Sequence, residues 1–559
     1  MGLRTSRRVG IKCATALAAV ASMTLALGAC SLGDETNPAE ALVDHFAEAL
    51  DKQDVGGASS LTSYPNAASA TIGQMFDGLK AKSVDYKVSQ FIGLDDSSGF
   101  FTLDAAWDFG QNRSWSYSAQ GSVRKLTTGW RISWDPTVVM PELDHGRSVH
   151  MVRTDAPPPR VLDNTGAVTL AEQTINAIKL DPSAMPDPVK STTELSKAIA
   201  PVAPLITSQS LMQDLVVAQG KPITAVSLRD DDFAILEPDI RPIPGVVVEK
   251  QPQLITADRR IDSPLVGALR NVWQANRDAT AGWAVQMFQP DNAPPTQLVG
   301  YQGPPGPDVP STLDTKLQLA AEDAVVSVAE PATIVAIQPS TGAVLAVAQN
   351  SQANDKGPIA FTGLYPAGSN LDAIKAATAI EKGVAPQDVK PEDVMQVASQ
   401  LGLGVDYKVP GLTETTGRFP QPGKGMEPVR NETPANDGVM VSPFGMALVA
   451  ASIARGGAAI PMIAFGQPAT TEAQLGPLRG DVADKLRALA KDGVGRPEMA
   501  SVRAYPDVTG LPGSAGDDQW FSGSKGDLAF SVYIQGAEGS DAAAKMSARL
   551  FRAMSHPSE

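Results

Sequence analysis

The sequence predicts a multidomain α+β protein, and three observations lead to that class. The chain has 559 residues, enough for two to four domains with hydrophobic cores of ordinary size. Near Val84 the spacing of apolar residues changes from a helical pattern to strand-like alternation. Two proline-rich stretches, residues 155–166 and 300–310, then divide the remainder of the chain.

The first 29 residues resemble a bacterial signal peptide rather than part of the fold. A basic stretch (RTSRR) precedes an apolar run from Cys13 to Ala29, and Leu-Gly-Ala-Cys follows at 27–30. Small residues before a cysteine resemble a lipobox, which implies cleavage before Cys30, lipid attachment to its thiol and a lipidated tether over residues 30–37. We therefore expect a lipid-anchored protein on the extracytoplasmic face of the plasma membrane. An uncleaved membrane-spanning helix is the alternative, and Sec and twin-arginine export both stay open.

Composition excludes several classes of function. The formal net charge is −15, and an acidic surface repels nucleic acids, so we expect no nucleic-acid partner. Cleavage would leave Cys30 as the last cysteine, which argues against disulfides and cysteine metal sites. The four histidines show no metal-binding spacing and offer few candidates for a Ser-His-Asp triad: His45, His145, His150 and His556. We expect neither a metal nor a cofactor.

The elements are expected in the following order. Leu42, Phe46 and Leu50 have helical spacing, and four stretches with period two follow: 85–94, 99–110, 114–123 and 129–136. A helix before a twisted antiparallel sheet predicts a small cone-shaped α+β domain over residues 38–147.

Residues 148–310 mix both patterns, with a helix expected at 170–180 and a strand at 244–255. Beyond residue 310 the pattern predicts a helix (314–328), two strands (332–339 and 343–350) and another short helix after Ser369.

A series of motifs in the last region carries a family resemblance. In order, these are STLDTKLQLAAEDAV (311–325), ATIVAIQPSTGAVLAVA (332–348), FTGLYPAGS (361–369), VSPFGMALVAASIARGG (441–457) and DDQWFSGSKGDLAFSVYIQG (517–536). Their order is similar to that in the transpeptidase domain of class B penicillin-binding proteins. WRISWDPTVVMPELDHG (130–146) resembles the end of the family's nuclear transport factor two-like N-terminal domain, and PPPRVLDNTGAVTL (157–170) resembles the start of its pedestal.

This resemblance implies three domains after the tether. They are a nuclear transport factor two-like domain (38–147), an elongated pedestal or dimerisation domain (148–310) and a transpeptidase-like α/β-sandwich domain (311–556). It also implies peptidoglycan stem peptides, or other proteins of cell-wall synthesis and division, as partners beside the membrane, and a possible homodimer.

Members of the family use a serine nucleophile in S-x-x-K, a second S-x-N motif and a K-T-G strand. A neutral lysine can remove the serine proton, and the K-T-G motif holds the carboxylate of the donor peptide. By resemblance Ser369 occupies the position of the nucleophile, but Asp372 replaces the lysine. Val508 replaces the lysine before Thr509 and Gly510, the remnant of the substrate-binding motif, and the chain contains no S-x-N triplet.

Two interpretations of Ser369 follow. Ser-x-x-Asp before an apolar run is typical of a helix capping box, in which the Ser369 oxygen accepts from the N3 amide and Asp372 reaches back. Alternatively, Asp372 could act as an unusual base, although a carboxylate with a pKa near 3.9 accepts a proton from an alcohol poorly.

The lost motifs favour a catalytically impaired pseudo-transpeptidase, a cell-wall lipoprotein that works as a scaffold or regulator. Two alternatives stay open. One is a divergent D,D-transpeptidase or β-lactam-binding enzyme that uses Ser369. The other is a lipoprotein that binds peptidoglycan peptides.

Overall fold

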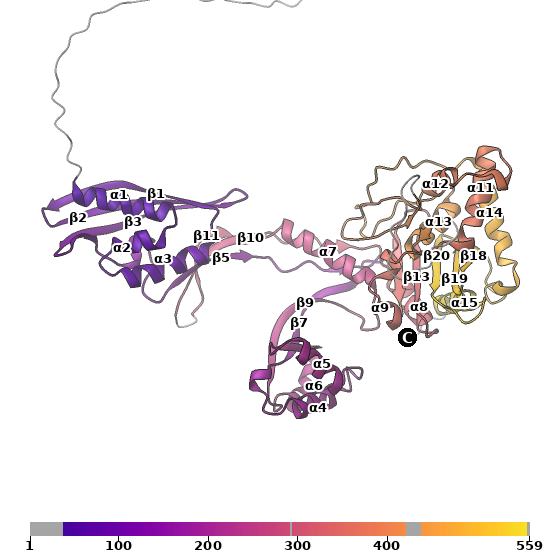
Figure 1. Cartoon of the computed structure of the whole chain (residues 1–559), viewed down its shortest axis with the longest axis horizontal. Helices are drawn as coiled ribbons and strands as arrows, with labels where there is room; N and C mark the ends of the chain where they lie inside the picture. The colour runs from indigo at the N-terminus through magenta and orange to yellow at the C-terminus, as the bar shows by residue number, and fades with distance from the viewer. Residues whose placement is uncertain (1–36, 291–292, 421–437, 556–559) are drawn as a thin grey trace, which may run out of the picture. The chain divides into compact units, whose positions relative to one another are not determined.

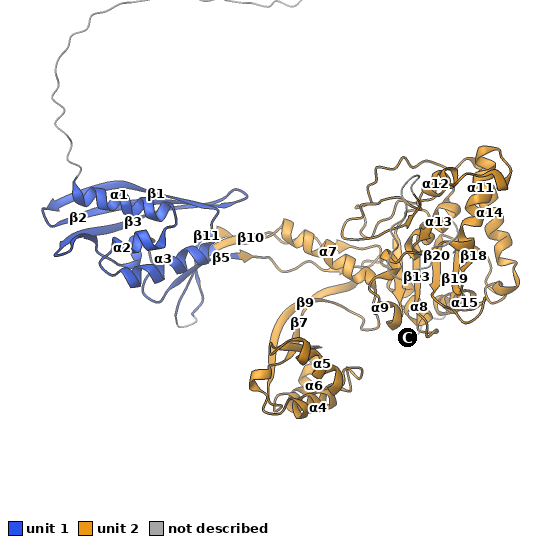
Figure 2. Cartoon of the chain, viewed as in Figure 1, with its two compact units in different colours: residues 1–152, 285–299 blue, residues 153–284, 300–559 orange. Residues whose placement is uncertain are grey.

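The computed structural model describes residues 37–290, 293–420 and 438–555. The chain forms two compact units, residues 1–152 with 285–299 and residues 153–284 with 300–559 (Figure 2). Their helices and antiparallel sheets confirm the predicted multidomain α+β class.

The structure does not test four of the predictions. The predicted signal peptide, the lipid attachment at Cys30 and the tether up to residue 36 lie outside the described residues. The domain limits 38–147, 148–310 and 311–556 also stay predictions. Within the described ranges, no helix combines the length and apolar character needed to cross a membrane.

Three helices in the first unit pack against one face of a sheet (Figure 1). They are α1 (Pro38–Asp51), α2 (Val55–Ser60) and α3 (Pro65–Leu79). The Asn37 side chain accepts a hydrogen bond from the Ala39 amide, and the helix that follows buries Val43, Phe46 and Leu50. The helical prediction for this segment is therefore confirmed, although Leu42, which was also expected on the buried face, is half-buried and Val43 is buried instead.

The sheet of the first unit has the order β1-β2-β3-β4, and all of its strands are antiparallel. Its strands are β1 (Ser83–Asp95), β2 (Ser98–Gly110), β3 (Arg113–Leu126) and β4 (Gly129–Ile132). Phe101, Leu103 and Trp107 alternate along β2 and are almost completely buried, and the Trp107 ring lies 5.8 Å from that of Phe76 in α3. The predicted period-two strands are confirmed, except that the last, predicted at 129–136, ends at Ile132. A short helix, η1 (Pro136–Val138), follows them.

A second sheet has three strands in the order β11-β10-β5. These are β5 (Ser148–Thr154), β10 (Gly282–Phe288) and β11 (Thr296–Tyr301).

The second unit begins with a sheet in which β7 (Val168–Leu180) is central. Its strands follow the order β12-β6-β7-β8, with β9 paired to the other side of β7. The partners are β6 (Val161–Leu162), β8 (Ile223–Arg229), β9 (Val246–Thr256) and β12 (Val309–Pro310). The connections between its strands contain four helices. Between β7 and β8 these are η2 (Pro182–Ala184), α4 (Pro188–Ile199) and α5 (Ser208–Val217), and between β8 and β9 there is α6 (Asp230–Ile240).

The helix predicted at 170–180 is wrong, because these residues form most of β7. Leu170 to Leu180 pair with β9 along their whole length. Ile175, Asn176, Ala177 and Ile178 are all buried, so the alternation that marks a half-exposed strand is missing. Pairing with strands far along the chain overrides the local pattern here.

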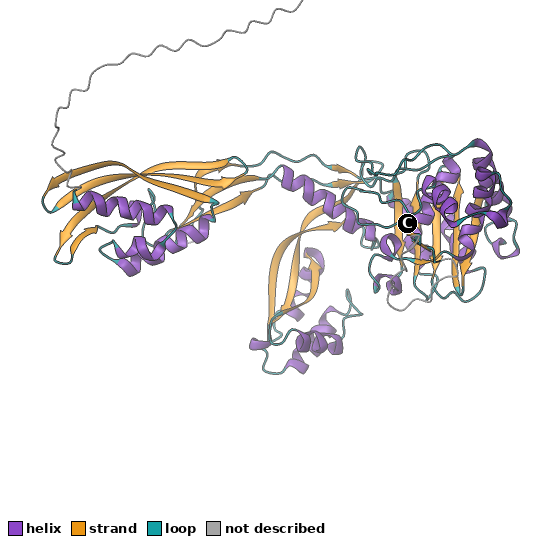
Figure 3. Ribbon diagram, turned by 45° about the horizontal axis from the view of Figure 1, so that its top comes forward, coloured by secondary structure: helices purple, strands orange, loops and turns teal. Residues whose placement is uncertain are grey.

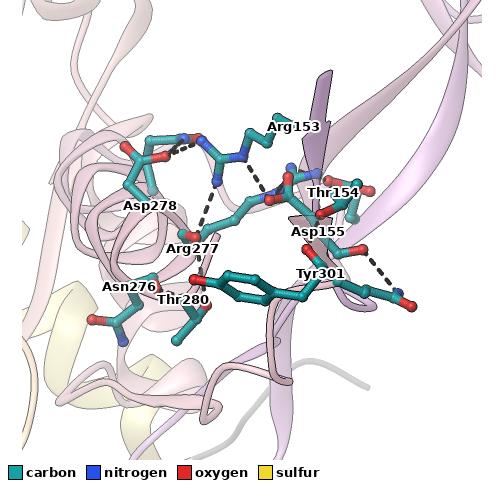
Figure 4. A network of polar contacts seen from close by, with 11 residues as sticks. Arg153, Thr154, Asp155, Asn276, Arg277, Asp278, Thr280 and Tyr301 are labelled. Atoms are coloured by element: carbon teal, nitrogen blue, oxygen red, sulfur yellow. Dashed lines mark hydrogen bonds and ion pairs between the residues drawn. The ribbon is translucent and has the colours of Figure 1, made fainter. Parts of the chain in front are cut away.

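Helix α7 (Pro264–Ala279) connects this sheet to the rest of the second unit. Its apolar side, including Leu269 and Val272, packs into the same core as β13 (Ala332–Ile337) and β14 (Val344–Gln349). At its C-terminal end Arg277 bonds to Asp155 at 3.1 Å and to Glu172 at 2.8 Å, while Arg153 joins Asp155 and Asp278 (Figure 4). This network fixes the end of α7 to the chain that enters the unit.

The main sheet of the second unit has the order β14-β13-β20-β19-β18 and is antiparallel throughout (Figure 3). Its strands are β13 (Ala332–Ile337), β14 (Val344–Gln349), β18 (Val508–Ala515), β19 (Asp518–Lys525) and β20 (Leu528–Ile534). Helices α8 (Thr315–Val325) and α15 (Ala542–Ser555) share one core with it. A core that includes Trp520 and Tyr533 contains residues of helices α11 (Asp372–Lys382), α12 (Pro391–Gln400), α13 (Pro443–Arg455) and α14 (Gly480–Val494).

The remaining elements surround this sheet and include the segment with Ser369. In order they are α9 (Ser351–Asn354), α10 (Ile359–Thr362), β15 (Tyr365–Pro366), η3 (Gly368–Leu371), α11 (Asp372–Lys382), η4 (Pro386–Asp388), α12 (Pro391–Gln400), β16 (Gly417–Arg418), β17 (Met440–Val441), α13 (Pro443–Arg455), α14 (Gly480–Val494) and η5 (Pro497–Met499). The predicted helix–strand–strand order beyond residue 310 is confirmed.

Candidate functional site

Ser369 lies on η3, directly beside the end of edge strand β18. Its Oγ accepts a hydrogen bond from the Ser514 amide at 2.9 Å, and its hydroxyl lies 3.4 Å from the Ser514 carbonyl oxygen. Both contacts go to the backbone of a strand 145 residues further along the chain. The serine hydroxyl is therefore tied to the sheet by main-chain groups.

Two glycines allow this close approach. A Cβ on Gly368 would lie 2.1 Å from the Ser514 carbonyl oxygen, and one on Gly513 would lie 2.0 Å from Asn370 Oδ1. Gly368 also has φ +52°, a conformation that side chains with a Cβ rarely adopt. The Asn370 side chain is buried and donates to the Ala367 carbonyl at 2.8 Å, so it braces the turn.

Aromatic rings of the main sheet pack against β15, the short strand that precedes Ser369. The Tyr533 ring lies 4.2 Å from that of Tyr365 in β15 and 4.3 Å from that of Trp520 in β19. The Tyr533 hydroxyl donates to Asp518 at 2.9 Å. Asp518 thus has a structural partner, and among the residues the structure describes no cluster of three possible metal ligands occurs.

The capping box predicted at Ser369 and Asp372 is wrong. Ser369 belongs to η3, and helix α11 starts only at Asp372 with no side-chain cap at its N-terminus. The Asp372 amide donates to the backbone carbonyl of Ser369, while the serine side chain bonds to Ser514. The contact with the sheet, which no local pattern predicts, replaces the cap.

No described ionisable side chain forms a hydrogen bond with Ser369. Asp372 is exposed, and Lys375 lies six residues after the serine, on α11. His45, His145 and His150 belong to the first unit, whereas Ser369 belongs to the second. Among the described residues, the hydrogen bonds of the Ser369 hydroxyl therefore go to the Ser514 backbone.

The structure does not bring Val508, Thr509 and Gly510 to Ser369. Thr509 lies five residues from Ser514 on an extended strand, a separation of about 17 Å. Its hydroxyl lies 3.2 Å from that of Ser524 on β19. A Cβ on Gly510 would come within 2.9 Å of the Gly523 Cα, so this glycine permits close packing of β18 on β19.

A different triplet directly precedes the contact with Ser369. Leu511, Pro512 and Gly513 come before Ser514 on β18, and Gly513 faces Asn370 of η3. Leucine has no cation, and proline has neither a hydroxyl nor an amide hydrogen. These positions offer no charged or hydroxyl side chain to a peptide carboxylate.

The segment expected to hold an S-x-N motif is also short in the structure. Helix α11 ends at Lys382, and α12 begins at Pro391 with only the short helix η4 between them. The described residues in this interval contain no serine.

Two buried carboxyl groups have strongly shifted pKa values, and neither bonds to Ser369. Burial raises the pKa of Glu322 on α8 to about 8, and that of Glu414 to about 7. Glu322 accepts hydrogen bonds from Gln318 at 2.7 Å and from the Asp262 amide at 3.2 Å. The sequence did not predict either pKa shift, because the burial of these two side chains depends on the packing of segments far apart in the chain.

Comparison with known proteins identifies the N-terminal domain. Residues 38–147 match the family model of the NTF2-like N-terminal transpeptidase domain. Such domains occur in class B penicillin-binding proteins. No curated protein matches the chain. The fold and this match thus define a class, multidomain α+β proteins with a transpeptidase-associated N-terminal domain.

Proposed function

We propose that this chain is a cell-wall lipoprotein of the penicillin-binding-protein family whose transpeptidase-like domain lacks acyl-transfer activity and acts as a scaffold or regulator. Lipid attachment at Cys30 and a location on the outer face of the plasma membrane belong to this proposal. The motif order of residues 311–536 and the family match at 38–147 support the relationship.

The observation that carries the inactive assignment is the environment of the Ser369 hydroxyl. A serine hydroxyl is a weak nucleophile until a neighbouring base removes its proton. Here the hydroxyl bonds only to the Ser514 backbone among the described residues. The side chains of Leu511 and Pro512 also leave a bound peptide carboxylate without a charged partner. Activation and substrate capture are both weakened, although the serine itself is held in place.

A fluorescent penicillin tests the proposal directly. The chain from residue 30 onward is incubated with the reagent, separated under denaturing conditions and examined by mass spectrometry, with Ser369→Ala as the matched control. We expect no adduct at this serine and equal background for both proteins. Stoichiometric labelling that disappears in Ser369→Ala would overturn the inactive assignment and favour the divergent enzyme.

The scaffold role is tested by crosslinking the full chain in living cells. We expect proteins of cell-wall synthesis or division to be captured equally by the unmodified chain and by Ser369→Ala. Capture of peptidoglycan fragments without any such protein would instead favour the peptide-binding alternative.

A further inference from the structure

The end of the β1–β2 hairpin carries apolar side chains that the core of the first unit does not use. Ile92 is 47%, Leu94 is 59%, Phe100 is 53% and Leu126 is 44% exposed. We call these four residues the hairpin patch. Ile92 and Phe100 are direct cross-strand partners, so their side chains lie on the same face of the sheet. Phe100 alternates with the buried residues of β2, so this face is opposite to the helices.

The hairpin patch lies beside the point at which the N-terminal tether meets the fold. Asn37 is the first described residue, and a Cβ on Gly93 would lie 3.7 Å from its Nδ2 atom. Gly93 stands between Ile92 and Leu94, and side chains alternate along a strand, so Asn37 lies at this end of the unit on the helix face, opposite Ile92 and Phe100. The same end of the unit thus contains both the apolar side chains and the entry of the tether.

The tether is too short to carry this end far from the residue at which it would be anchored. Cys30 precedes Asn37 by seven residues, and seven residues span at most about 25 Å even when fully extended. Lipid attached at Cys30 would therefore hold the hairpin patch within a short distance of the bilayer surface.

The charges near the hairpin patch have both signs. Arg124 and Lys125 are exposed at the end of β3, and Asp95 and Asp96 occupy the hairpin turn. Arg131, the cross-strand partner of Arg124, adds a third basic residue, so charges of both signs stand side by side here and form no patch of a single sign. The four exposed apolar side chains of the hairpin patch instead match the boundary between lipid headgroups and acyl chains, where the burial of apolar area drives binding.

We propose that the hairpin patch is a second membrane contact, which inserts into the interfacial region of the bilayer and fixes the orientation of the N-terminal domain. A single lipid anchor leaves the attached domain free to rotate. A second contact beside the tether restricts that rotation. This inference rests on the proposed lipoprotein function through the anchor at Cys30.

The test places an environment-sensitive dye on the hairpin patch. The chain from residue 30 carries Cys30→Ser and an N-terminal histidine tag, and vesicles of phosphatidylcholine with nickel-chelating lipid hold it at that end. The dye is attached to Phe100→Cys or, as the matched control, to Ala106→Cys. Ala106 is also exposed on the same face of β2, about 20 Å from Phe100.

On vesicles we expect the dye at position 100 to shift to shorter emission wavelengths and to react several-fold more slowly with dithionite, an aqueous quencher. The dye at position 106 should keep its solution behaviour. Adding Ile92→Ser and Leu94→Ser to the Phe100→Cys chain should abolish the protection, and an unchanged circular dichroism spectrum shows that the domain still folds.

Equal quenching at positions 100 and 106 on vesicles would overturn the proposal. Protection that arises only when an envelope protein is added would also overturn it, because the hairpin patch would then bind a protein. The nickel-chelating lipid replaces the natural anchor, so the result does not depend on lipidation in the cell. The mass of the natural N-terminal peptide tests lipidation at Cys30 separately.

Discussion

At the scale of single residues, the position of Ser369 depends on glycines on both sides of a close contact. Its hydroxyl meets the Ser514 backbone because Gly368 and Gly513 remove the two Cβ atoms that would separate η3 from β18. Asn370 fills the space beside Gly513 with its amide group. The turn is thus built to hold the serine against the sheet, whatever its chemical activity.

Replacing Gly513 should disturb this contact. In Gly513→Ala the added Cβ would meet Asn370 Oδ1 at 2.0 Å, so η3 or the asparagine must move. We expect a destabilisation of about 1–3 kcal/mol, typical of overpacking, measured as a lower transition temperature of the second unit. Gly480→Ala is the control, because no atom lies within 4 Å of its added Cβ. Equal stability of both variants would show that the contact is not tight.

At the scale of elements, α7 illustrates how polar contacts fix one helix to several segments. Arg277 bonds to Asp155 and Glu172, whose side chains are 17% and 16% exposed, and its guanidinium lies 5.1 Å from the Trp273 ring centre. The indole of Trp273 donates to the Pro159 carbonyl at 2.6 Å. The C-terminal end of α7 is therefore held by charge, ring and backbone contacts together.

Removing this guanidinium should destabilise the second unit. Arg277→Met keeps much of the apolar stem but leaves two mostly buried carboxylates without their shared partner. We expect a loss of about 2–3 kcal/mol, below the range for fully buried pairs because Arg277 itself is 25% exposed. Calorimetry measures it, and Lys545→Met, which removes an exposed pair with Asp541, should change the free energy of unfolding by less than about 0.5 kcal/mol. Similar losses in both variants would contradict the structural role of the network.

The elements also differ in how well the sequence predicted them. The helix and two strands after residue 310 were predicted correctly, because their apolar spacing matches their own period and short turns separate them. Strand β7 was predicted as a helix, because burial on both faces removes the alternation. Only its pairing with β8 and β9 reveals a central strand.

At the scale of the whole molecule, the two units have separate interiors, and their stability should respond differently to pH. Burial raises the pKa of Glu322 from the ordinary 4.5 to about 8, so the folded second unit binds a proton that the unfolded chain releases. Stability from this group is complete below the unfolded pKa and is lost as the pH rises through the folded value. The second unit should therefore become less stable between about pH 5 and pH 8.

Glu322→Gln should reduce this dependence, while Glu414, whose pKa burial raises to about 7, still contributes a loss of stability as the pH rises to about 7. Glutamine keeps the oxygen that accepts from Gln318 and Asp262 but cannot ionise. We expect its transition temperature to exceed that of the unmodified chain by a few degrees near pH 8, and the difference to shrink near pH 5. Calorimetry follows both units in one scan, with the transition of the first unit as an internal control. A parallel pH dependence for the two proteins would exclude Glu322 as the cause.

The order of motifs, the α+β class and the loss of the lysines expected near Ser369 follow from residue identity and local periodicity, so they can be predicted without a structure. The folded chain was needed to show that β7 is a strand, that Ser369 bonds to Ser514 instead of capping α11, and that Leu511 to Gly513 rather than Val508 to Gly510 directly precede that contact. Each of these outcomes depends on contacts between segments far apart in the chain, and a local pattern carries no information about such contacts.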